Sequence, residues 1–148
     1  MCCKELRDRL GGKNDCYAIS TVASEKGRQF RLNLTAGKTV CKVKIDACLI
    51  DDPKIAKCDY LIKVRPDDKY FLVELKETDV EHAVEQIVKT FYTVNQLIKA
   101  SPQHFTGHII SSAIPRAAEQ KFRNLKEKTL RKNKLNIVKH SFKCELSM

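Results

Sequence analysis

The sequence predicts an α/β fold in which helices flank a central mixed sheet. Two patterns lead to this expectation. Apolar residues alternate with polar ones in several short runs, whereas between residues 80 and 98 they recur every three or four positions. A third observation is size, because 148 residues of which 43% are apolar suffice to bury one core. We therefore expect a single domain over residues 1–148 that alternates between helices and strands.

The first half of the chain is expected to form a helix and then a hairpin. Near-helical spacing of apolar residues predicts a helix over 15–26, and Gly27 follows it as a stop signal. Alternation begins at residue 29, and a turn at 36–38 separates two runs, the second of which continues to residue 50. These two runs predict an antiparallel strand pair.

The second half begins with another strand pair, over 58–64 and 69–76, around a turn that contains Pro66. The apolar stripe of residues 80–98 then predicts a long helix. The remaining expected elements are a strand over 106–113, a basic helix that opens at Pro115, and a last strand over 135–144.

The charge of the chain points to a polyanionic partner. Its 28 basic and 18 acidic residues give a net charge of +10, and the excess is concentrated in residues 116–134. A dense basic surface attracts nucleic acid, so we expect Lys121, Arg123 and Lys128 to contact phosphates. The alternative for such a helix is a solvated, functionally neutral face.

The cysteines and the opening residues bear on the compartment. Seven cysteines without a C-x-x-C pair argue against a zinc knuckle and against a disulfide scaffold. No run of eighteen uncharged apolar residues exists, and the first residues are charged. We therefore expect free thiols, no membrane segment and a cytoplasmic location.

A candidate catalytic site lies where two predicted strands meet. Glu74 and Lys76 are two apart on a strand and project to one face, and Asp59 joins them if the strand that it begins is the neighbour. The two carboxylates and the Leu75 backbone carbonyl are hard oxygen ligands suited to Mg²⁺ or Mn²⁺. A metal-bound water could then attack phosphorus, with Lys76 positioning it and offsetting negative charge.

The acid-x-Lys pattern alone is not specific, because the chain contains four such triplets. The triplet at Glu74 differs from the others, since it follows four strand-forming residues, 70–73. Charges attached to a buried strand are costly to place and suggest a use. The structural alternative is an ion-pair network at the edge of the sheet.

Asp59, fourteen intervening residues and then Glu74-Leu75-Lys76 resemble the motif of the PD-(D/E)XK nuclease superfamily, the restriction-endonuclease-like enzymes. Segments 58–61 and 71–77, with Ala83-x-x-Gln86, look like a small uncharacterised microbial branch of it. The likeness spans about residues 15 to 113, although Cys58 replaces the usual proline. It implies an αβββαβ core and a magnesium-dependent endo- or exonuclease, with DNA as the favoured substrate.

Such enzymes often add two further polar residues to the site. The resemblance implies a glutamate from the first helix, for which Glu25 is the first candidate and Glu5 the second. It also implies a polar residue from the helix after the E-x-K strand, for which Gln86 is the candidate. His82 lies on the same polar side and could touch a phosphate. An ordinary surface position is the alternative for Gln86 and for His82.

Two other functional classes stay open at the level of sequence. One is a non-catalytic nucleic-acid- or protein-binding module that kept the nuclease fold, and binding of a divalent metal would separate it from an enzyme. The other is an RNA-directed enzyme, because no recognisable element reads base edges. The sequence also leaves the oligomeric state open, a homodimer included.

Overall fold

The computed structural model describes residues 2–75, 79–112 and 116–148. Its helices are α1 (Cys2–Leu10), α2 (Val80–Ile98) and α3 (Arg116–Asn133), with single 3₁₀ turns η1 (Asn14–Cys16) and η2 (Pro102–His104). Its strands are β1 (Tyr17–Ala18), β2 (Val22–Glu25), β3 (Arg28–Asn33), β4 (Thr39–Lys44), β5 (Tyr60–Arg65), β6 (Lys69–Leu75), β7 (Phe105–Ser111), β8 (Asn136–Ser141) and β9 (Lys143–Ser147).

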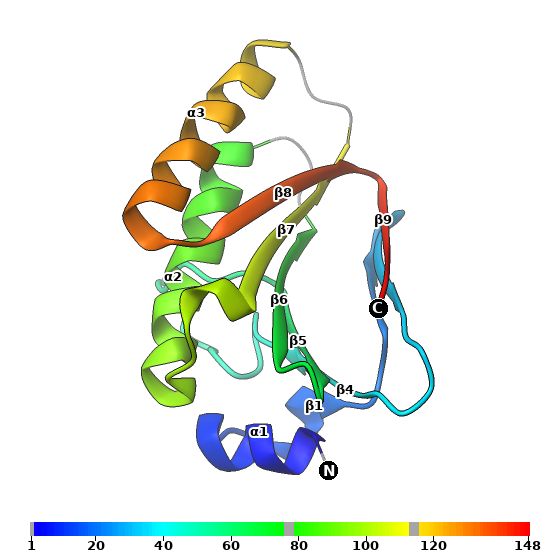
Figure 1. The fold of residues 1–148 in the computed structure, drawn as a ribbon. Helices are drawn as coiled ribbons and strands as arrows, with labels where there is room; N and C mark the ends of the chain where they lie inside the picture. Colours follow the sequence, from blue (N-terminus) through cyan, green and yellow to red (C-terminus); the bar gives the residue numbers. More distant parts are fainter. Residues whose placement is uncertain (1, 76–78, 113–115) are drawn as a thin grey trace.

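The strands form two sheets. The larger one has six strands in the order β1-β4-β5-β6-β7-β8, and it is mixed because β6, β7 and β8 are parallel while the other pairs are antiparallel. The smaller one has the order β2-β3-β9. The predicted mixed α/β class with a mixed sheet is confirmed. The three helices, however, share one core with the large sheet, and the small sheet covers its other face (Figure 1).

The helix-side core depends on α2. Its buried residues recur at helical spacing and include Ala83, Ile87 and Phe91, which pack against the large sheet. Asp79 caps the helix by accepting a hydrogen bond of 3.0 Å from the His82 N–H. α2 therefore forms as the sequence predicts, with its first turn directly beyond the strand that carries Glu74.

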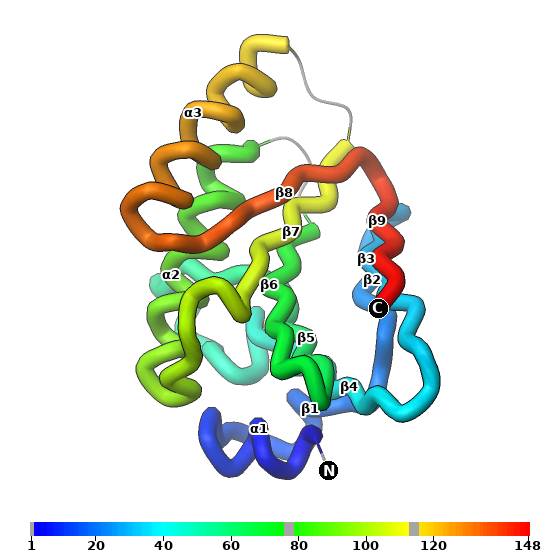
Figure 2. The backbone as a smooth tube through the Cα atoms, in the orientation of Figure 1, coloured from blue at the N-terminus to red at the C-terminus, as the bar shows by residue number. Residues whose placement is uncertain are grey.

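The second core lies between the two sheets. Phe30 and Leu32 of β3 are buried against Phe71, Val73 and other residues of the large sheet. β9 joins this layer by pairing in parallel with β3, and Figure 2 shows the chain turning sharply from β8 into β9. The predicted single last strand is thus two strands in different sheets.

The helix expected over 15–26 is wrong. These residues form η1, β1 and β2, and Lys26 and Gly27 make a tight turn in which both have positive φ. Glu25 pairs with Arg28 across this two-residue turn, as is typical of a β-hairpin. β2 and β3 are therefore the two strands of a hairpin. The N-terminal helix is instead α1.

The hairpin expected over residues 29–50 is also wrong, although both strands exist. β3 pairs with β2 and β9, whereas β4 pairs with β1 and β5. Alternation shows which face of a strand is buried but not which strand lies beside it. By contrast, β5 and β6 pair as antiparallel neighbours, as predicted.

The expectation that all cysteines are free thiols is wrong for four of them. Disulfides join Cys3 to Cys41 and Cys16 to Cys48, across sequence separations of 38 and 32 residues. They tie α1 and η1 to β4 and to the loop that follows it. Cys2, Cys58 and Cys144 are free and buried. None of the helices in the described part of the chain is long and apolar enough to span a bilayer.

Candidate metal centre

Asp59 is held in place by backbone bonds on both sides. Its N–H donates to the Val73 carbonyl at 3.1 Å, and its own carbonyl accepts from the Ile45 N–H at 2.9 Å. Because Tyr60 is opposite Val73 in the ladder, Asp59 lies beside Glu74 at the carboxyl end of β6. The predicted juxtaposition of these two acids is therefore present.

The side chain of Asp59 reaches across to β6. Its Oδ2 atom accepts a hydrogen bond of 2.8 Å from the Leu75 N–H. Burial raises the pKa of the Asp59 carboxyl, hydrogen bonds with Leu75 and with the Glu74 side chain oppose this rise, and Glu25 adds to it. Two carboxyl groups that share a buried site need a proton or a cation between them. This arrangement suits a divalent metal ion.

Glu74 is almost completely buried, with 2% of its surface exposed. Glu74 lies near Cys58: burial raises the pKa of the Cys58 thiol, and the negative charge of Glu74 raises it further. Cys58 therefore stays a neutral thiol under ordinary conditions. Leu75 packs on the opposite face of the sheet, in the core between the sheets. The role of its carbonyl as a metal ligand stays a prediction, and Lys76 lies outside the described residues.

A hollow of about 160 Å³ opens beside Asp59. Its lining includes Glu25, Asp46 and Asp59, together with Lys44 and Tyr60. Glu25 comes from β2 rather than from a first helix, yet it reaches the neighbourhood that the sequence predicts for it. Three carboxylates around one hollow make it strongly attractive to cations.

Asp46, one of the three acids around this hollow, was not singled out in the sequence analysis. Its N–H donates to the Asp59 carbonyl at 3.4 Å, and its side chain lies 4.0 Å from the Lys57 ammonium. The signal that could have found it is its place just beyond β4, the strand that pairs with β5. An acid at that end of β4 must lie near Asp59.

Glu5, the second candidate for a first-helix acid, lies elsewhere. It is in α1 and forms an ion pair with Arg65 at the far end of β5 from Asp59. Glu25 is therefore the acid of the two that the structure brings near the site.

Gln86 contacts the backbone that leads into Asp59. Its Nε2 donates to the Lys57 carbonyl at 2.9 Å, and one residue further on the Cys58 N–H donates to Thr90 Oγ1 at 2.8 Å. The Thr90 hydroxyl in turn donates to the Gln86 carbonyl at 2.8 Å. α2 thus fixes the residues before Asp59, which makes Gln86 and Thr90 positioning residues in this geometry. Thr90 was missed, although a polar residue within the apolar stripe of α2 signals it.

His82 lies farther out on the same helix. It lines a larger hollow, of about 470 Å³, together with Gln86, Lys57 and Lys89. This hollow adjoins the loop between β4 and β5, and its lining includes three lysines, Lys54, Lys57 and Lys89, beside the acids Asp46 and Glu85. This hollow is large enough for a phosphate, and it shares Asp46 with the smaller hollow beside Asp59.

The predicted phosphate contacts lie on α3, which runs beside α2 (Figure 1). Lys121 is 2.6 Å from the Glu81 carboxylate in the first turn of α2, and Arg123 is exposed. Lys128 lines a groove between the two helices. Because α3 follows β7 and β7 pairs in parallel with β6, the start of α3 lies at the same end of the sheet as Glu74.

No family model, curated protein or solved structure matches the chain. What the protein does is therefore inferred from its own residues.

Proposed function

We propose that the protein is a magnesium- or manganese-dependent nuclease that hydrolyses phosphodiester bonds in DNA, on a restriction-endonuclease-like core. The observation that carries this proposal is the hydrogen-bonded contact of Asp59 with Glu74 and Leu75 where β5 begins and β6 ends. The order β4-β5-β6 followed by α2 and the parallel β7 is compatible with such a core.

The donor set fits a hard divalent cation. Asp59 and Glu74 supply carboxylate oxygens, and Glu25 and Asp46 add negative charge at the adjoining hollow. Mg²⁺ uses one or two protein carboxylates and completes its shell with water and phosphate oxygens. A cation between the two acids would also remove the need for the shared proton.

Each residue of the site has a separate role in this proposal. The bound metal would supply an activated water and polarise the scissile phosphate. Asp59 and Glu74 hold it, while Gln86 and Thr90 fix the backbone that carries Asp59. Lys76 follows Leu75 in the sequence, and its predicted role is to stabilise the charge that develops on the phosphate.

The partner is proposed from charge. A net charge of +10 and the basic helix α3, which starts at the same end of the sheet as Glu74, favour a nucleic acid. For the compartment, the two disulfides favour an oxidising environment over the reducing cytoplasm that the sequence predicts.

A cleavage assay tests the proposal. Labelled single-stranded, duplex and branched DNA, with RNA of the same sequences, are incubated with the protein in Mg²⁺, in Mn²⁺ or in EDTA. The wild type should cut DNA only with metal. Glu74→Gln and Lys76→Ala should each lose about a hundredfold or more of the rate.

The matched control is Lys69→Ala, at the opposite, exposed end of the same strand, which should keep full activity. Full activity in Glu74→Gln and Lys76→Ala would show that the cleavage comes from a contaminant. Nucleic-acid binding without cleavage or metal binding would instead identify the non-catalytic module.

A further inference from the structure

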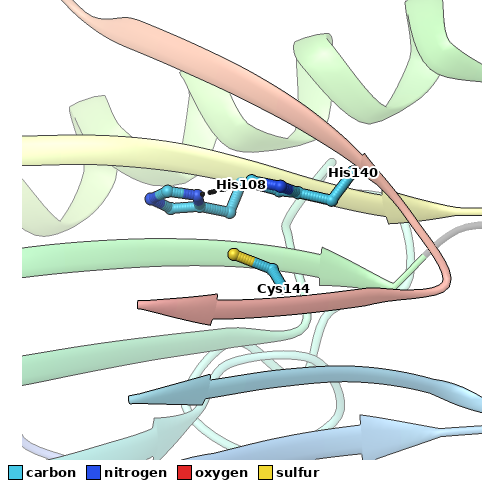
Figure 3. Close-up of side chains that lie close together, drawn as sticks. All are labelled: His108, His140 and Cys144. Carbon is cyan, nitrogen blue, oxygen red and sulfur yellow. Dashed lines mark hydrogen bonds between the residues drawn. The ribbon is translucent and has the colours of Figure 1, made fainter. Parts of the chain in front are cut away.

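Three potential metal ligands from three strands converge on the face of the large sheet that meets the small sheet. They are His108 of β7, His140 of β8 and Cys144 of β9, and their ligand atoms all lie within 4.8 Å of one another (Figure 3). His108 Nδ1 and His140 Nε2 are 3.3 Å apart. This cluster is separate from the acids at the end of β6.

The strand register explains the convergence. His108 is opposite Val138 in the β7–β8 ladder, so His140, two residues further, shares its face. The chain then turns at Phe142, which has a positive φ of 62°, and returns as β9. There Cys144 is opposite Phe30 of the small sheet and points back toward the histidines.

The spacing of the nitrogens suits a tetrahedral ion. Zn–N bonds of 2.0–2.1 Å at tetrahedral angles put two ligand nitrogens about 3.3 Å apart. The His108 and His140 nitrogens already have this separation. The Cys144 Sγ lies within 4.8 Å of the histidine ligand atoms, so the thiol has to move toward them to reach the Zn–S distance of about 2.3 Å.

The second nitrogen of His108 has the partner that ligating histidines require. His108 Nε2 is 2.9 Å from the Thr106 hydroxyl oxygen, to which it can donate its proton. With the proton there, the lone pair of Nδ1 faces His140. Such an outer hydrogen bond fixes both the tautomer and the ring orientation of a metal ligand.

The surroundings favour a soft, dehydrated ion. His108 and Cys144 are each 4% exposed, and the rings of Phe30 and Phe71 lie 5.0 and 5.6 Å from the His108 ring. The cluster contains nitrogen and sulfur ligands and no carboxylate. Imidazole with thiolate selects zinc over magnesium or manganese.

We propose that His108, His140 and Cys144 bind one zinc ion, with a water molecule as the fourth ligand. Binding breaks the S–H bond of Cys144, releases that proton to solvent and forms a Zn–S bond. Two ligands belong to the large sheet and the third to the small sheet, so the ion ties the two sheets together. The site does not depend on the proposed nuclease activity.

Cobalt substitution tests the site directly. Co²⁺ is titrated into the full chain without thiol reductant, so that both disulfides stay closed. The wild type should show intense visible bands of tetrahedral cobalt and a near-ultraviolet sulfur-to-cobalt band, both abolished by one equivalent of Zn²⁺. Cys144→Ser should lose the sulfur band, and His140→Gln should bind at least tenfold more weakly.

Two controls separate this result from other effects. His104→Gln, at a histidine that lies in neither proposed metal site and bonds the Asp68 carbonyl, should behave as the wild type. Zn²⁺ should also protect Cys144 of the wild type from alkylation, as read by peptide mapping, which needs no variant to fold. A wild type without the sulfur-to-cobalt band, a band that persists in Cys144→Ser, or unprotected Cys144 would overturn the proposal.

Discussion

Asp59 Oδ2 accepts a hydrogen bond of 2.8 Å from the Leu75 N–H. The bond joins the residue before β5 to the last residue of β6, and it holds the Asp59 carboxyl beside Glu74. A carboxylate fixed by a backbone donor needs little reorganisation to receive a cation. The proposed metal ligands are thus positioned by the same ladder that builds the sheet.

Thr90 should matter for stability as well as for the site. Thr90→Val leaves the buried Cys58 N–H without its acceptor, which should cost about 1–3 kcal/mol of the free energy of unfolding. Thr93→Val is the matched control, because its hydroxyl bonds a carbonyl on the exposed side of the same helix and should change stability by less than about 0.5 kcal/mol. Urea denaturation measures both. Equal effects would contradict the role of Thr90.

Gly107 of β7 lies directly against Ile87 of α2. A Cβ atom there would lie 2.7 Å from Ile87 Cγ2 and 3.1 Å from Ile137 Cγ1. Gly107→Ala should therefore lower the free energy of unfolding by about 1–3 kcal/mol through overpacking. In a double-mutant cycle with Ile87→Ala, the two changes should be less than additive by about 1 kcal/mol. If the destabilisation caused by the two substitutions is simply additive, the contact between residue 107 and Ile87 is not the source of the strain.

The sequence predicted those elements whose signal is local. The strand that carries Glu74 and the stripe of α2 could be found because each pattern lies within one element. The partners of β3 and β4, and the two disulfides, depend on contacts between distant segments. Asp46 was missed for the same reason, since its importance comes from the strand end that it touches, whereas Thr90 was missed although its polar side chain interrupts the apolar stripe of α2. Cys144 joins His108 only because the chain turns at Phe142.

Histidine burial should make the metal-free protein sensitive to acid. Burial lowers the pKa of His108 to about 3, whereas its ordinary value is 6.5. Between these two values the unfolded chain binds a proton on His108 and the folded chain does not. The free energy of unfolding therefore decreases as pH falls from about 6.5 toward 3. For one histidine the slope is at most about 1.4 kcal/mol per pH unit.

Urea denaturation in EDTA at several pH values measures this slope. His108→Phe, which can occupy the space beside Phe30 and Phe71, should flatten it, and the exposed His82→Gln should leave it unchanged. An unaltered slope in His108→Phe would assign the acid sensitivity to other groups.

The basic helix should govern salt dependence. Replacing Lys121, Arg123 and Lys128 with Gln should weaken binding to DNA of every sequence. The slope of log affinity against log salt should become shallower by about 0.9 for each phosphate that the variant no longer neutralises. Metal binding should not change, because these residues are not ligands. Fluorescence anisotropy at a series of salt concentrations gives both the affinity and the slope.

A control with the same change in net charge is available. Lys4, Lys13 and Lys143 are exposed residues outside α3, and their replacement with Gln should alter the slope less. If both triple variants behave alike, α3 is a solvated face. The phosphates would then follow another basic track, for which the sequence suggests Lys42, Lys44 and Lys63; of these, Lys63 is buried in the structure.

Calorimetric titration of Mn²⁺ into metal-free protein tests the nuclease-type metal centre most directly. Wild type and Asp8→Asn, a control at an exposed acid of α1, should bind Mn²⁺ with equal affinity. Asp59→Asn and Glu74→Gln should fold and yet lose more affinity than the roughly 10- to 100-fold that follows removal of an outer-shell partner. Unchanged Mn²⁺ affinity in both folded variants would show that Asp59 and Glu74 hold no metal.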